Sequence, residues 1–86
     1  MTRDEALAII DAEELDPYSW FEDPTNRTDL VGIDRDGEKW VVYTTNERAV
    51  MEGVRKYGSE GSTLDDFIKR LRGQKVYQEV ARRRGW

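Results

Sequence analysis

Two runs rich in β-branched and aromatic residues, at about 30–34 and 39–45, most constrain the fold of this 86-residue chain. The polar segment between them contains an Asp-Gly pair, whose glycine supplies the positive φ that a tight turn requires. The pattern therefore predicts two strands joined as an antiparallel hairpin. A third strand is expected at about 48–57, where Gly53 indicates a bulge or a weak edge.

A helical pattern precedes the strands. Thr2 and Glu5 have the spacing of a capping box, and apolar residues then recur at helical intervals, so a helix is expected at about 3–15. Residues 16–29 contain both prolines of the chain and show no sustained periodicity. This segment is expected to be a long loop.

The end of the chain carries two apolar groups that differ in helical phase. Residues 64–72 form a regular apolar stripe, which Gly73 interrupts. Three apolar residues follow, namely Val76, Tyr77 and Val80. At about 100° per residue they fall opposite the first stripe, so a continuous helix would bury one group and expose the other. Two separate helices are therefore expected, at about 64–72 and 75–84.

These elements predict an α+β fold in a single domain over residues 1–86. Its order is α-β-β-β-α plus a short C-terminal helix, with a three-stranded antiparallel sheet covered by helices on one face. In the strand at 39–45, Trp40 and Val42 are expected to point inward, although bulky residues occupy both faces.

The composition argues against catalysis. The chain contains no His and no Cys, which removes the commonest general base, the thiolate nucleophile and the usual ligands of zinc and copper. No catalytic residue, cofactor site or metal site is expected, and the protein is not expected to be an enzyme. No apolar run has the roughly 18 to 20 residues of a membrane span, so a cytoplasmic protein is expected.

Charge is distributed unevenly along the chain. Residues 1–38 carry 12 acidic and 3 basic side chains, a balance of −9, whereas residues 39–86 carry 6 acidic and 11 basic side chains, a balance of +5. The acids of the first part are interleaved with aromatic residues, a composition typical of interface hot spots. The predicted partner-binding residues are Asp11, Glu13, Glu14, Asp16, Tyr18, Trp20, Phe21, Glu22 and Asp23. Two simpler interpretations stay open: the acids give solubility, and the rings pin the loop to the core.

Two segments carry a family resemblance. Residues 39–49, Lys-Trp-Val-Val-Tyr-Thr-Thr-Asn-Glu-Arg-Ala, and residues 67–71, Phe-Ile-Lys-Arg-Leu, resemble small bacterial immunity proteins, specifically immunity protein family fifty-nine. The likeness extends over most of the chain, including the Tyr-Ser-Trp-Phe segment. It implies an α-β-β-β-α protein, encoded beside a polymorphic toxin, that binds and neutralises this cognate toxin.

Other functions remain open from the residues alone. An acidic surface suits a phage or mobile-element inhibitor that mimics nucleic acid. The basic stretch 69–84 suits a small nucleic-acid-binding domain, although the acidic chain as a whole argues against nucleic-acid binding. The C-terminal segment 82–86, from Arg82 to Trp86, is expected either to fray or to contact a partner or a second copy in a homodimer.

Overall fold

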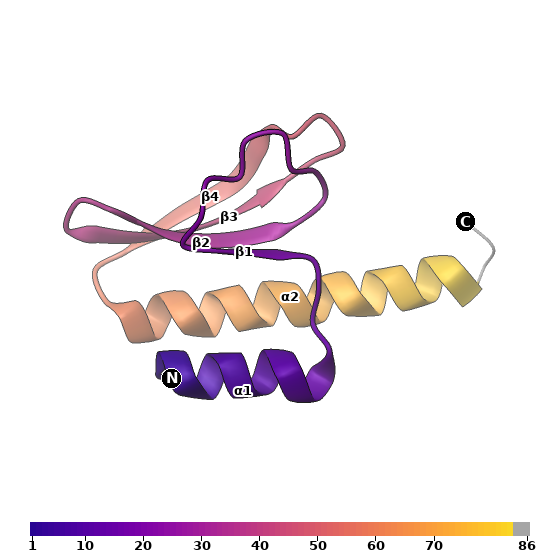
Figure 1. Cartoon of the computed structure of the whole chain (residues 1–86), viewed down its shortest axis with the longest axis horizontal. Coiled ribbons are helices and arrows are strands. Elements are labelled where there is room, and N and C mark those ends of the chain that lie inside the picture. The colour runs from indigo at the N-terminus through magenta and orange to yellow at the C-terminus, as the bar shows by residue number, and fades with distance from the viewer. Residues whose placement is uncertain (84–86) are drawn as a thin grey trace.

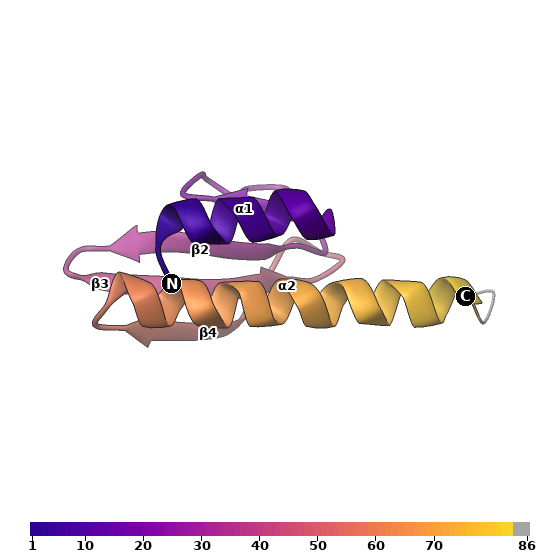
Figure 2. The ribbon, with the colours of Figure 1, turned by 90° about the horizontal axis from the view of Figure 1, so that it is seen from below.

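A computed structural model describes residues 1–83 and shows two helices packed against a four-stranded sheet (Figure 1). The elements in chain order are α1 (Arg3–Glu13), β1 (Tyr18–Trp20), β2 (Val31–Asp36), β3 (Lys39–Thr45), β4 (Met51–Tyr57) and α2 (Glu60–Arg83). Both helices cover the same face of the sheet, side by side and running in the same direction (Figure 2). The predicted α+β class is confirmed.

The expected hairpin is formed by β2 and β3, which pair antiparallel with Ile33 opposite Val42. Gly37 has a φ of +63°, as the turn requires. β4 pairs antiparallel with β3, and the register shifts between Val42 and Thr44, where two residues of β4 oppose one of β3. Gly53 lies in this shift with a φ of +56°, which confirms the bulge.

The sheet differs from the prediction in one strand. Tyr18–Trp20 forms β1, which pairs parallel with β2, so that the sheet has four strands in the order β1-β2-β3-β4 and is mixed. The expected loop 16–29 therefore contains a strand. A three-residue strand has too few positions to show alternation, and its parallel partner lies across a long connection. Local sequence patterns do not report such a pairing.

The sheet face opposite the helices is covered in its middle. The ring of Tyr43 lies over Gly32, where an added Cβ would come within 2.1 Å of Tyr43 Cζ. Only glycine leaves room for the ring at that position. The segment 21–30 crosses this face (Figure 1), Tyr43 is 1% exposed, and burial raises the pKa of its phenol. Val42 is buried on the helix side as expected, and Trp40 is half-buried.

The core lies between the sheet and the helices. The Thr2–Glu5 capping box is present and begins α1, which contributes Ala6 and Ile10 to the core. The stripe of α2 contributes Leu64, Phe67, Ile68 and Leu71, each 0–1% exposed. Three ion pairs then join the two helices along their length: Met1 N with Asp65, Arg3 with Glu60, and Glu13 with Arg72.

The C-terminal part differs from the prediction in its continuity. One 24-residue helix, α2, replaces the two expected helices at 64–72 and 75–84. Gly73 costs a helix interior roughly 1 kcal/mol relative to Ala, which good helix formers on either side overcome. The change of apolar phase is real, however, because Val76, Tyr77 and Val80 are 59%, 68% and 37% exposed. The second half of α2 extends beyond α1 and the sheet (Figures 1 and 2). Arg84, Gly85 and Trp86, part of the predicted terminal contact segment, lie outside the described residues.

Candidate functional site

The aromatic residues of the predicted site face the core. The ring centroids of Tyr18 and Trp20 lie 6.3 Å and 5.8 Å from that of Phe67 on α2. Phe21 packs edge-on against Trp40 at 6.0 Å, and the Arg3 guanidinium lies 4.5 Å above its ring. These half-buried rings hold β1 on the helical layer. Replacing Trp20 would remove core packing as well as any partner contact.

The two acids that follow β1 serve local structure. The segment that contains Glu22 and Asp23 turns onto the sheet face opposite the helices (Figure 1). Glu22 lies 3.6 Å from an Arg27 nitrogen. Asp23 accepts hydrogen bonds from the backbone N–H and the hydroxyl of Thr25, at 3.0 and 2.5 Å, and these bonds lower its pKa. The structure therefore separates these carboxylates from the acids of α1.

Glu13 is committed to the contact between the helices. Its carboxylate accepts two hydrogen bonds from the Arg72 guanidinium, at 3.0 and 2.6 Å, and this pairing holds its pKa below the ordinary value. The Lys75 ammonium donates to the backbone carbonyl of Glu13 and so satisfies one free carbonyl at the end of α1. Two cations thus offset the charge of Glu13.

Three of the predicted carboxylates are exposed in the last turn of α1 and in the segment that follows it: those of Asp11, Glu14 and Asp16. None of the three forms an ion pair with another residue of 1–83. Glu14 caps the helix in the left-handed conformation, with a φ of 52°, and the last turn of α1 contains no basic residue. The carboxylates therefore add to the negative end of the helix dipole. We call Asp11, Glu14 and Asp16 the acidic turn.

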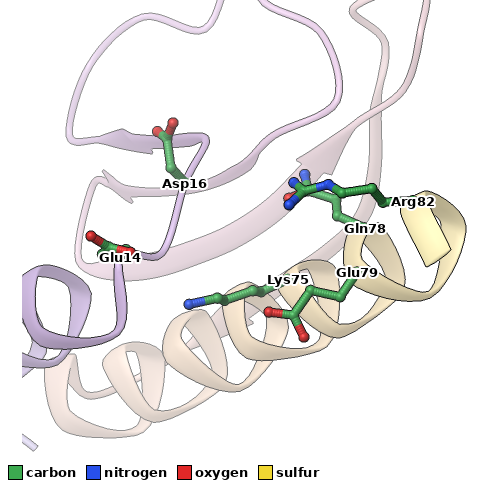
Figure 3. A pocket seen from close by; sticks show the side chains of 6 residues that line it. All are labelled: Glu14, Asp16, Lys75, Gln78, Glu79 and Arg82. Atoms are coloured by element: carbon green, nitrogen blue, oxygen red, sulfur yellow. The ribbon is translucent and has the colours of Figure 1, made fainter.

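A polar recess of about 390 Å³ separates the acidic turn from the second half of α2 (Figure 3). Glu14 and Asp16 line one side. The other side, from α2, is lined by Lys75, Gln78, Glu79 and Arg82. Figure 3 shows the Lys75 ammonium directed toward the turn that carries Glu14 and the Arg82 guanidinium beside Gln78, whereas the carboxylates of Glu14 and Asp16 point away from α2. The lining thus combines two carboxylates on one side with two cations and the Glu79 carboxylate on the other.

Sequence reasoning identified the acidic wall of this recess and missed the wall from α2. The two walls are about sixty residues apart in the chain, and helix packing alone brings them together. The charge asymmetry between the two parts of the sequence was the one available signal, because it showed that opposite charges would meet if the chain folded back on itself.

Three cations of the basic stretch 69–84, Arg70, Arg72 and Lys75, are bonded within the molecule. Arg70 donates to Asp66 at 3.2 Å and to the Gly53 carbonyl at 2.7 Å. Arg72 and Lys75 are both bonded to Glu13. These three cations are poorly placed to contact a phosphate backbone, whereas Lys69, Arg82 and Arg83 form no ion pair within residues 1–83.

Within residues 1–83, no group of three or more acidic side chains is arranged to hold a metal ion. Neither of the two helices combines the length and the apolar composition needed to cross a bilayer, as far as residue 83. No family model, curated protein or solved structure matches this chain.

Proposed function

We propose that this protein works by binding a positively charged partner protein at the acidic turn and the adjoining recess. One observation carries the proposal: Asp11, Glu14 and Asp16, at and just after the negative end of α1, are exposed and form no ion pair inside residues 1–83. The other acids of the predicted site are either paired or bonded locally. The unpaired carboxylates are thus the part of the predicted site that an incoming cation can contact.

The recess gives this surface a means of selecting its partner. A Lys or Arg side chain that enters beside Glu14 and Asp16 meets carboxylate acceptors, and long-range attraction by the acidic turn raises its rate of arrival. Arg82 on the opposite wall is a donor for a backbone carbonyl or a carboxylate of the same partner, whereas Lys75 is already bonded to the Glu13 carbonyl. A partner surface with a basic residue flanked by hydrogen-bond acceptors fits this arrangement better than a uniformly basic surface does.

The class of partner follows from the resemblance at residues 39–49 and 67–71. We propose that the chain is an immunity protein and that the partner is its cognate toxin. A basic patch on a toxin that handles anionic substrates is the kind of target that an acidic turn neutralises.

Charge reversal at the acidic turn tests the proposal. The variant Asp11→Lys/Glu14→Lys is compared with Glu38→Lys/Glu47→Lys, which changes the net charge equally at two exposed positions elsewhere. Each tagged protein is used to capture partners from the source organism, the captured protein is identified by mass spectrometry, and its binding to each variant is measured by calorimetry. We expect the acidic-turn variant to lose at least tenfold in affinity and the control to change little.

A protection assay in cells completes the test. If the captured protein is a toxin, co-expression should protect cells with the wild-type chain and with the control variant, and less with the acidic-turn variant. Undiminished binding by the acidic-turn variant contradicts the proposed site. Capture of nucleic acid instead of protein contradicts the proposed function.

A further inference from the structure

The face of α2 that points away from the sheet is exposed along the whole helix. Ser62, Asp65, Lys69, Gly73 and Val76 all lie on it and are exposed. In the second half of the helix this face becomes apolar, because Val76, Tyr77 and Val80 lie beside Gly73. An apolar stripe that a soluble chain leaves uncovered indicates a contact surface, and glycine allows close approach of another backbone.

The charges along one flank of this stripe alternate. Asp65, Arg72, Glu79 and Arg83 follow one another at spacings of seven, seven and four residues, so they lie on one side of the helix. Their order is acidic, basic, acidic, basic. The Asp65 side chain is 62% exposed and that of Arg72 is 50% exposed. Asp65 also pairs with the Met1 amino group, and Arg72 also pairs with Glu13.

When a second copy of the helix runs in the opposite direction, its charges are complementary to those of the first. In an antiparallel pair of identical helices, the same flank of each helix faces that of the other. Asp65 then lies opposite Arg83 of the second copy, and Arg72 lies opposite its Glu79. In a parallel two-fold pair, this flank of one helix would face the opposite flank of the other, so these four residues would not meet. The charge pattern therefore selects a two-fold, antiparallel contact.

We propose that the protein forms a homodimer in which the α2 helices of two copies pack antiparallel through their outward faces. The two-fold axis passes close to Gly73 and Val76, so that Val76, Tyr77 and Val80 of one copy cover the region around Gly73 of the other. Both partners supply the same residues, as an isologous contact requires.

The dimer leaves the acidic turn accessible. Lys75, Gln78 and Arg82, which line the recess, lie roughly half a turn around α2 from the apolar stripe. Glu79 alone borders both surfaces. The inference goes beyond the proposed function and does not depend on it, because self-association and capture of a basic partner use different sides of the helix.

Sedimentation equilibrium from micromolar to millimolar concentration measures the association of the 10.1 kDa chain. We expect the wild type to approach twice this mass. The variant Val76→Gln/Tyr77→Gln/Val80→Gln should weaken dimerisation by at least tenfold, because it removes the apolar contact while keeping residues that suit an exposed helix. The matched control is Val50→Thr/Met51→Thr/Val54→Thr, which removes three exposed apolar side chains on and beside β4 and should leave dimerisation unchanged.

A charge swap tests the antiparallel pairing. Asp65→Arg alone, or Arg83→Asp alone, creates two repulsive contacts per dimer and should weaken dimerisation about tenfold. The double variant Asp65→Arg/Arg83→Asp restores opposite charges and should recover affinity to near the wild-type value. Circular dichroism confirms that each variant keeps its fold.

Spin labels measure the direction of the helices, and the absence of native Cys makes single labels straightforward. In the antiparallel dimer, labels on Ser62→Cys should be about 35 Å apart along the helix axis, and labels on Lys69→Cys about 15 Å apart. Equal separations at the two positions would contradict the antiparallel arrangement. A monomer at all concentrations, or no recovery in the double charge variant, would overturn the proposal.

Discussion

The two halves of α2 share one backbone and have opposite environments. In the first half, Leu64, Phe67 and Leu71 are 0–1% exposed and form the helical side of the core. In the second half, Val76 and Tyr77 are 59% and 68% exposed, and the side that continues the core stripe carries polar residues. A helix can therefore belong to the core over half of its length and offer a contact surface over the other half, when the apolar positions change phase between them.

The second half does not need core packing in order to be helical. A separate helix of this length would be marginal in water, because nucleation is costly. Here the first half has already nucleated the helix, so each further residue adds a hydrogen bond without that cost. Lys75 donates to the Glu13 carbonyl and Gln74 donates to the Pro17 carbonyl, which ties the start of the second half to the end of α1 and to the segment before β1.

The largest expected difference between the halves is in folding stability. Phe67→Ala should lower the free energy of unfolding by about 3–5 kcal/mol, because it leaves a cavity beneath Tyr18 and Trp20. Tyr77→Ala, which also removes a ring, should change it by about 0.5 kcal/mol or less. Urea denaturation followed by circular dichroism measures both. Similar losses for the two variants would show that the second half also belongs to the core.

Gly73 lies at the boundary between the halves, and its replacement tests their continuity. An added Cβ at Gly73 meets no atom within 4 Å, so Gly73→Ala should raise the free energy of unfolding by about 0.5–1 kcal/mol in dilute solution. Gly37→Ala is the control, because a φ of +63° disfavours alanine and the variant should be destabilised. Destabilisation by Gly73→Ala would contradict a continuous helix.

The Glu13–Arg72 pair joins α1 to the end of the first half and predicts a pH dependence. The Arg72 hydrogen bonds hold the pKa of Glu13 below its ordinary 4.5. The contribution of the ion pair to folding stability is therefore fully present above that value. The contribution is lost as the pH falls through the lowered pKa. Thermal unfolding between neutral pH and about pH 3 should therefore show a smaller loss of stability for Glu13→Gln than for the wild type. Identical pH profiles would indicate that the pair contributes nothing.

The smallest expected effect lies within the second half. In solution dilute enough to hold the monomer, Val76→Gln and Val80→Gln should each change the free energy of unfolding by no more than about 0.5 kcal/mol. The same variants should weaken self-association at high concentration. A marked loss of stability in the monomer would show that these side chains pack within the chain, and it would remove the contrast between the halves.

Several elements were predictable because their causes are local. The capping box at Thr2 and Glu5, the turn at Gly37 and the bulge at Gly53 each follow from residues close together in the sequence. The phase change after Gly73 was also visible, but its consequence was not. The prediction broke the helix to bury both apolar groups, whereas the structure keeps the helix and exposes the second group.

The candidate site was likewise predictable only in part. The exposure of Asp11, Glu14 and Asp16 agrees with their charge. The inward position of Tyr18, Trp20 and Phe21 was one of two open interpretations, and only Phe67 and Trp40, distant in the sequence, decide between them. A ring among acids looks the same in a sequence whether it contacts a partner or its own core.

The sequence by itself determined the α+β class, the hairpin, the first helix and the separation of acidic from basic residues, because periodicity, turn chemistry and charge act over a few residues. Only the tertiary structure decided that Tyr18–Trp20 is a strand, that α2 is continuous, and that Glu14 and Asp16 line the same recess as Lys75 and Arg82. These features depend on contacts between residues far apart in the chain. Their free energy comes from packing that exists only after the whole chain has folded.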